Sequence, residues 1–100
     1  MSSNKPISIA SWNCRGLRGE APPELQINNN TYDLWCLQET MVTENIYLHS
    51  NIFNFIRSDI RCPDQRGVAI AIKKSFRYDL LDITHLSHHS IELIGIKLYT

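Results

Sequence analysis

The chain has 100 residues, of which 43% are hydrophobic and 20% are charged. This is the composition of an ordinary globular domain, and it excludes a disordered tail, a collagen and a coiled coil. The longest apolar runs, such as residues 68–72, are far shorter than the roughly 18 residues that cross a bilayer, so the sequence predicts no membrane partner. We expect residues 1–100 to belong to one domain.

Ten basic and ten acidic residues give a net charge of zero, but the charges are unevenly distributed. The segment 57–77 holds six basic residues and two acidic residues. A local positive excess suits a polyanion such as nucleic acid. A solvated surface whose charges lie beside an apolar strand also explains the positive excess, and charge alone favours this second interpretation.

The first residues do not form a signal peptide, because Ser8, Ser11 and Asn13 interrupt the apolar stretch. We therefore expect an intracellular protein, in the cytoplasm or the nucleus, that is not secreted. The three cysteines are odd in number and form no C-x-x-C pair, which argues against a disulfide scaffold and against a zinc site.

Apolar periodicity in the first half of the chain predicts two strands and a short helix. Residues 7–13 alternate between two faces, and Asn13 ends this strand. Two prolines then open a weak helix over residues 24–29. The run L-W-C-L within residues 32–39 is apolar on both faces, which is typical of a central strand, and Glu39 lies where that strand leaves the core.

The second half is richer in strands, although residues 44–49 are ambiguous and admit a short helix. The class is therefore α/β (α+β), mainly one mixed β-sheet with one or two short helices. Such a sheet needs a covering layer that one weak helix does not supply, so we expect the first part of a larger domain. The elements expected here are strands at 53–57, 67–72, 78–83 and 91–99 and a turn at 62–66.

Asn13 and Glu39 are the candidate site residues, because each ends a strand and ligand sites collect at such sheet rims. A carboxylate is a hard oxygen ligand suited to Mg²⁺, and a nearby amide can orient a phosphate or a water molecule. The simpler alternative is a solvated Glu39 before a turn and an Asn13 that forms a turn. Composition and spacing alone favour this alternative, since loops normally hold such residues.

Three sequence motifs favour the metal-site interpretation of Asn13 and Glu39 over this simpler alternative. They read I-A-S-W-N-C-R-G-L at residues 9–17, Y-D-L-W-C-L-Q-E-T at residues 32–40 and R-G-V-A-I-A-I at residues 66–72. Their order and intervals resemble the opening of the exonuclease–endonuclease–phosphatase superfamily. Within it, the closest resemblance is to the endonuclease domain of non-LTR (LINE-type) retrotransposons. The resemblance covers essentially the whole chain.

The resemblance implies a sandwich of the DNase-I-like type, two mixed sheets with helices outside, of which this chain is the incomplete N-terminal portion. It also implies hydrolysis of DNA phosphodiesters with Mg²⁺ or Mn²⁺. By motif, Glu39 corresponds to the metal-binding glutamate and Asn13 to the catalytic asparagine beside it. The partners implied are DNA, the missing C-terminal half of the domain and, on a longer chain, a reverse transcriptase.

The sequence also departs from the family pattern. It lacks the later tyrosine, G-D-F-N and S-D-H motifs, so we expect this chain alone to be inactive or nearly so and to bind metal weakly. A single Gly67 stands where the family commonly has two glycines. The histidines match no metal-binding spacing, and three of them are expected in one solvated loop. The four histidines are His49, His85, His88 and His89, and the last three are those expected in the loop.

Other residues near the motifs have two interpretations each. Arg15 and Arg18 either contact DNA phosphates or solvate the loop after the first strand, and we hold the two interpretations about even. Cys14 is expected to be a partly buried structural cysteine rather than a reactive thiol. Trp12 and Trp35 are expected in the core rather than as platforms for base stacking, because both lie within apolar strands.

Two other functions remain open from the sequence. The basic segment 57–77 would suit a non-catalytic module that binds nucleic acid or another chain. A decayed fragment that folds poorly would instead aggregate through its uncovered sheet face.

Overall fold

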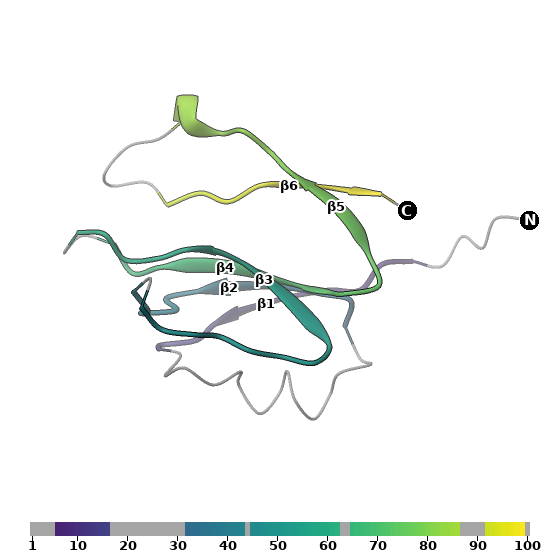
Figure 1. Ribbon diagram of the computed structural model, residues 1–100, viewed down its shortest axis with the longest axis horizontal. Coiled ribbons are helices and arrows are strands. Elements are labelled where there is room, and N and C mark those ends of the chain that lie inside the picture. Colours follow the sequence, from purple (N-terminus) through teal and green to yellow (C-terminus); the bar gives the residue numbers. More distant parts are fainter. Residues whose placement is uncertain (1–5, 17–31, 44, 63–64, 87–91, 100) are drawn as a thin grey trace, which may run out of the picture.

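The computed structural model describes residues 6–16, 32–43, 45–62, 65–86 and 92–99. Within these ranges the chain is a small, mixed, sheet-rich α+β domain with almost no helix (Figure 1). The helix expected at residues 24–29 lies outside the described ranges. The elements are β1 (Ile9–Asn13), β2 (Leu34–Gln38), β3 (Phe53–Ser58), β4 (Val68–Lys73), β5 (Arg77–Leu80), the 3₁₀ helix η1 (Thr84–Leu86) and β6 (Ile96–Tyr99).

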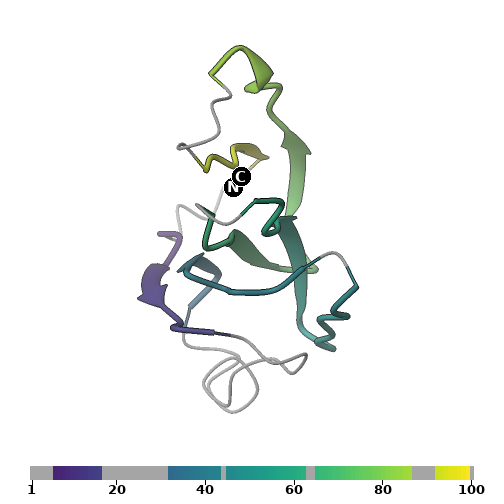
Figure 2. The ribbon, with the colours of Figure 1, turned by 90° about the vertical axis from the view of Figure 1, so that its left-hand side faces the viewer.

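Four strands form the main sheet in the order β1-β2-β4-β3. Strands β1 and β2 are parallel, whereas β4 runs antiparallel to both β2 and β3. Figure 2 shows these four strands side by side, with β5 and β6 above them. Strand β2 is paired on both sides, which confirms that the apolar run L-W-C-L forms a central strand.

The largest buried cluster lies on the face of the main sheet away from β5 and β6, while Leu34 and Ile72 are buried on the opposite face. Alternate residues of β2, β3 and β4 point into this cluster, and the segment that follows β2 covers them. Phe53, Leu37 and Val42 are almost completely buried there. The buried members of this cluster are Trp35, Leu37, Val42, Leu48, Phe53, Ala69 and Ala71.

Most strands lie in one mixed sheet, as expected, but β5 and β6 pair with each other and, within the described residues, form a second, two-stranded sheet. The chain leaves the main sheet at a turn after β4, in which the Phe76 N–H donates to the carbonyl of Lys73 (3.0 Å). Strand β6 begins at Ile96, later than expected, and residue 91 lies outside the described ranges.

A helix does not form over residues 45–49. The Ile46 N–H closes a turn on the carbonyl of Thr43 (3.0 Å), and the chain then runs extended. Leu48 is buried while Tyr47 and His49 are exposed, which is the two-residue alternation of extended chain. The remaining expectations were close, and the turn at 62–66 is closed by the Gln65 N–H on the carbonyl of Cys62 (3.0 Å).

None of the helices in the described ranges is long or apolar enough to cross a membrane.

Candidate functional site

Asn13 and Glu39 come together at one end of the main sheet. Asn13 is the last residue of β1, and Glu39 directly follows β2. Because β1 and β2 are parallel and Asn13 pairs in register with Gln38, both strands deliver their ends to the same rim. The Asn13 Nδ2 donates a hydrogen bond of 2.5 Å to Oε2 of Glu39, across 26 residues of sequence. The two residues predicted from strand ends are therefore in direct contact.

Both polar atoms of the Asn13 side-chain amide form hydrogen bonds. Its Oδ1 accepts a hydrogen bond from the backbone N–H of Arg15 (3.2 Å), the short-range bond of an Asx turn. Its Nδ2 therefore faces Glu39, since only the amide nitrogen can donate. Asn13 thus forms the turn that the simpler interpretation expected, and it also orients the carboxylate of Glu39.

The backbone at this rim is strained. Glu39 and Met41 have φ values of 51° and 58°, and Arg15 has a φ of 52°. Side chains other than glycine visit this left-handed region at a cost of about 1–2 kcal/mol each. Strained backbone of this kind collects at functional sites when the surrounding structure holds it in place.

Backbone hydrogen bonds from both neighbouring strands hold that strained segment. On one side the Gly16 N–H donates to the carbonyl of Glu39 (2.8 Å). On the other side the Thr40 N–H donates to Gly67 (3.1 Å) and the Met41 N–H donates to Arg66 (2.8 Å). The position of the Glu39 side chain is therefore determined by three segments of the chain.

Gly67 allows this close approach. Its φ is 85°, and a Cβ atom there would overlap the side chain of Thr40, which is completely buried. The single glycine of the R-G-V-A-I-A-I motif is thus needed for both its backbone conformation and its lack of a side chain.

Glu92 is a second carboxylate at this rim, and sequence reasoning missed it. Its two oxygens accept hydrogen bonds from the backbone N–H groups of Arg66 (2.7 Å) and Gly67 (2.6 Å). The sequence placed Glu92 only within the strand expected at 91–99, and nothing local indicated a partner 25 residues away. Glu92 positions the backbone that holds Thr40 and Met41.

Of the two basic residues expected near the site, one lies within the described residues and one does not. Arg15 is exposed at the rim, beside Asn13, and Arg18 lies outside the described residues. The role of Arg15 toward DNA stays a prediction.

Cys14, Trp12 and Trp35 pack in or against the core, whereas the expected histidine loop is only partly within the described residues. Cys14 is half-buried and packs against the core. Trp12 and Trp35 meet edge to face, with ring centroids 6.4 Å apart, and Trp35 is buried. His85 is exposed in η1, whereas His88 and His89 lie outside the described residues, as Figure 1 indicates in grey.

The donor set at the rim suits a hard, hydrated cation. Among the described residues, no group of three or more His, Cys, Asp or Glu side chains is placed to hold a metal ion. Glu39 offers one carboxylate with a hydrogen bond on Oε2 only, as far as the described residues go. Mg²⁺ is commonly held by one or two carboxylates while it keeps several water molecules, so this pair fits Mg²⁺ as a weak site.

Comparison of the chain with family models, with curated proteins and with solved structures finds no match.

Proposed function

We propose that this chain carries the metal-holding part of a divalent-cation-dependent endonuclease that hydrolyses phosphodiester bonds of DNA. The observation that carries the proposal is the hydrogen bond between Asn13 Nδ2 and Glu39 Oε2. It joins the two motifs whose resemblance to the exonuclease–endonuclease–phosphatase superfamily is most specific. The finer fold proposed with it is the N-terminal portion of a DNase-I-like sandwich.

The chemistry follows from the residues at the rim. Glu39 would hold Mg²⁺, or Mn²⁺, through its carboxylate, and Asn13 would keep that carboxylate in one orientation. The cation supplies neutralisation of the negative charge that builds on the phosphate oxygens. The strained backbone at Glu39 keeps its side chain at the rim, where a phosphate can approach.

Cation binding is tested first on the Asn13 side chain itself. We expect MgCl₂ to shift the Asn13 side-chain NH₂ resonances saturably and weakly in an NMR titration, because a single carboxylate contributes to binding. Glu39→Gln should abolish the shift, since it removes the charge and keeps the size. Asp79→Asn, on the other sheet, is the matched control and should leave the shift unchanged.

A titration that Glu39→Gln leaves unchanged would overturn the proposal. Equal shifts around Asn13 and Asp79 would do the same, because they would indicate unspecific counterion binding.

Nicking of supercoiled plasmid DNA with Mg²⁺ tests how much of the machinery this chain holds. We expect no nicking above an EDTA control, because the printed sequence has no G-D-F-N or S-D-H motif to orient water and stabilise the transition state. Mg²⁺-dependent nicking that Glu39→Ala abolishes would show that the chain contains a complete site.

A further inference from the structure

A groove runs along strand β3 from the rim that holds Glu39. Its first part, a cavity of about 500 Å³, lies beyond the end of β3 and is lined by Arg57, Asp59 and Arg61 among others. Its second part, a cavity of about 280 Å³, lies between β3 and the segment 47–50. Arg57 lines both parts, so the two cavities adjoin at its side chain.

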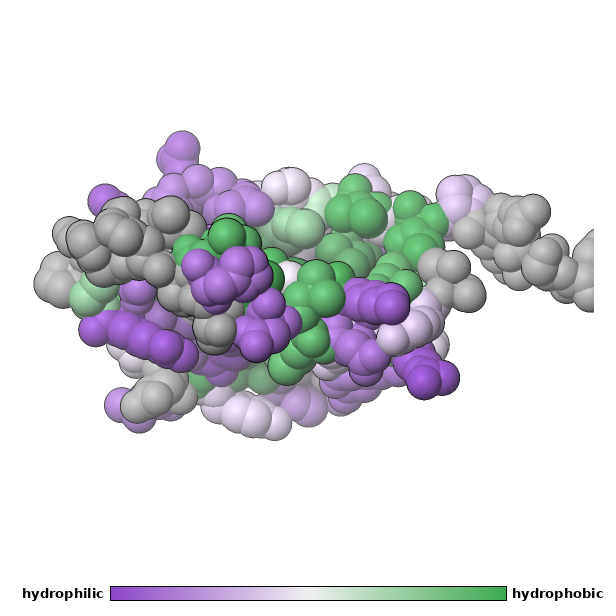
Figure 3. All heavy atoms as spheres, turned by 90° about the horizontal axis from the view of Figure 1, so that it is seen from above, coloured by the Kyte–Doolittle hydropathy of each residue, from purple (hydrophilic) through white to green (hydrophobic). Residues whose placement is uncertain are grey.

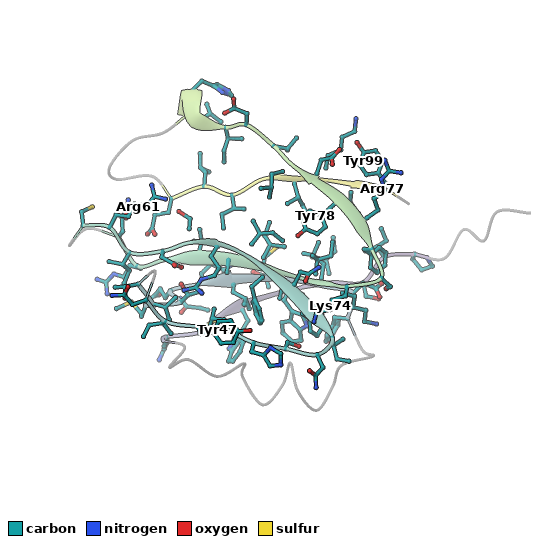
Figure 4. The ribbon with its side chains drawn as sticks, viewed as in Figure 1. Tyr47, Arg61, Lys74, Arg77, Tyr78 and Tyr99 are labelled. Carbon is teal, nitrogen blue, oxygen red and sulfur yellow. The ribbon has the colours of Figure 1, made fainter. Side chains whose placement is uncertain are left out.

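The groove carries a positive excess. Arg61 and Lys74 are exposed, and neither side chain forms an ion pair with another described residue. Arg57 is half-buried and is fixed by the Asp59 carboxylate (2.8 Å) and by the carbonyl of Thr43 (3.1 Å). Figure 4 places Arg61 at the left end of the main sheet and Lys74 toward its right end. Cations therefore occur at both ends of the groove and between them.

An exposed aromatic pair lies in the same groove. Tyr47 is 75% exposed, and its ring stacks on that of His49 at an interplanar angle of 16°. Tyr47 lines the second part of the groove together with Lys74, and Figure 4 shows Tyr47 on the lower side of the main sheet. An aromatic ring with this much exposed surface offers a flat face to a further ring.

The segment that presents Tyr47 is held in place from below. Leu48 is buried in the core, only 7% exposed, so the neighbouring side chains must point outward. The Ser50 Oγ accepts hydrogen bonds from the backbone N–H groups of Ile52 and Phe53 (3.1 Å each) and ties the segment to the start of β3. The backbone that presents Tyr47 is thus held in place by Leu48 and Ser50, which lowers the entropy cost of binding.

We propose that this groove binds single-stranded nucleic acid, with a base stacked on Tyr47 and phosphates along Arg61, Arg57 and Lys74. Aromatic rings interleaved with cations in a groove are the general features of single-strand binding. A duplex keeps its bases stacked on one another, so it would meet the cations but leave the Tyr47 ring unused. Single-stranded nucleic acid therefore uses both features of the groove.

The groove deepens the proposed function, since it leads away from the rim that holds the Asn13–Glu39 pair. Ser58 ends β3 at the same rim as Asn13, three strand spacings or about 14 Å across the sheet. A nucleic-acid strand that is cut at Glu39 would thus extend into the groove. The inference rests on the proposed function only for this placement, because binding in the groove requires neither metal nor hydrolysis.

The test measures binding of a fluorescein-labelled dT₁₂ oligonucleotide by anisotropy in EDTA. We expect saturable binding that weakens with salt and exceeds binding of the matching duplex. Tyr47→Ala should weaken binding by at least fivefold, because stacking of one base contributes about 1–3 kcal/mol, whereas Tyr47→Phe should retain binding. Lys74→Gln should lower the slope of log K against log salt by about 0.7, the value of one single-strand phosphate contact.

Two control variants show whether a loss of binding is specific to Tyr47 and the groove. Tyr99 is also a surface tyrosine, but the cations of Arg77 and Lys97 already lie 5.0 and 5.5 Å from the centroid of its ring. Tyr99→Ala should therefore not change the affinity. Asp79→Asn, in β5, should not change it either. Because binding is measured in EDTA, it does not depend on a metal ion, so failure of the metal site and failure of the groove give different results.

The inference is wrong if Tyr47→Ala binds dT₁₂ within twofold of the unmodified chain, or if duplex binds as well as single strand. Circular dichroism of Tyr47→Ala should match the unmodified chain, since this exposed ring contributes little to the core.

Discussion

Asp33 joins three strands at the end of the main sheet opposite Glu39. Its Oδ2 accepts a hydrogen bond from the Ser8 N–H (3.0 Å), and its Oδ1 lies 3.3 Å from Nζ of Lys73. The hydrogen bond from Ser8 is the main cause that holds the pKa of Asp33 below its usual value of 3.8; partial burial opposes it, and Lys73 adds to the lowering. A lowered pKa means that the ionised carboxylate stabilises the fold.

The pH dependence of the free energy of unfolding should reflect the ionisation of the Asp33 carboxylate. The contribution of Asp33 is present above pH 3.8 and is lost as the pH falls through that value toward the lower pKa of the folded state. Urea unfolding should therefore show Asp33→Asn less stable than the unmodified chain at pH 7, with the difference shrinking at pH 3.

Lys73→Met distinguishes the two causes. It removes the ion pair and keeps the hydrogen bond from Ser8, so most of the acid dependence should remain. Loss of all the acid dependence in Lys73→Met would assign the lowered pKa to the ion pair instead.

At the scale of the single residue, sequence reasoning identified Asn13 and Glu39 but not the way they act on each other. Strand ends and motifs were enough to single out both residues. The left-handed backbone of Glu39 and the carboxylate of Glu92 depend on hydrogen bonds to segments distant in the sequence, which no local pattern records.

Between the elements, the junction of β2 and β4 depends on the absence of a side chain at Gly67. The carbonyl of Gly67 accepts a hydrogen bond from the N–H of Thr40, whose side chain is buried directly against it. Gly16, on the side of β1, also has a positive φ of 110°, but a Cβ there would meet only the Cβ of Met41 at 3.9 Å, an ordinary van der Waals contact.

Gly67→Ala should lower the free energy of unfolding by about 2 kcal/mol or more, because an unfavourable φ and an overlap with Thr40 add together. Gly16→Ala has the unfavourable φ alone and should cost less. Thermal or urea unfolding of both variants measures the difference. Equal losses in the two variants would show that Thr40 moves aside.

Among the elements, the strands of the main sheet were the predictable ones. Each has an apolar run or an alternation that burial imposes along the strand, and each was expected within two residues of its observed bounds. The segment 44–49 was ambiguous because two apolar residues, Ile46 and Leu48, are too few to fix a helical or a strand period over so short a length. The burial of Leu48 under the sheet selected the extended form.

On the scale of the whole molecule, the face that carries β5, η1 and the segment before β6 is apolar and exposed. Leu80 is 65% exposed and Leu93 is 43% exposed. Figure 3, which views the molecule from this side, shows apolar side chains gathered in its middle. Contiguous exposed apolar surface of this kind favours association in water.

We expect the chain to self-associate with rising concentration in sedimentation velocity experiments. The double variant Leu80→Lys/Leu93→Lys should shift the distribution toward monomer, since it places charges within the apolar face. Met41→Lys, at an equally exposed apolar residue of the rim, is the control and should leave association unchanged. Equal effects of both variants would indicate that net charge, rather than this face, governs association.

Periodicity was sufficient to predict a mixed, strand-rich domain and its central strand, whereas the choice of Asn13 and Glu39 at the rim also needed the sequence motifs. These features follow from burial and backbone pairing within single segments. The separate β5–β6 sheet, the engagement of Glu92 and the groove beside Tyr47 arise from contacts between segments far apart in the chain. Such contacts depend on how whole elements pack, which the pattern of any one segment leaves open.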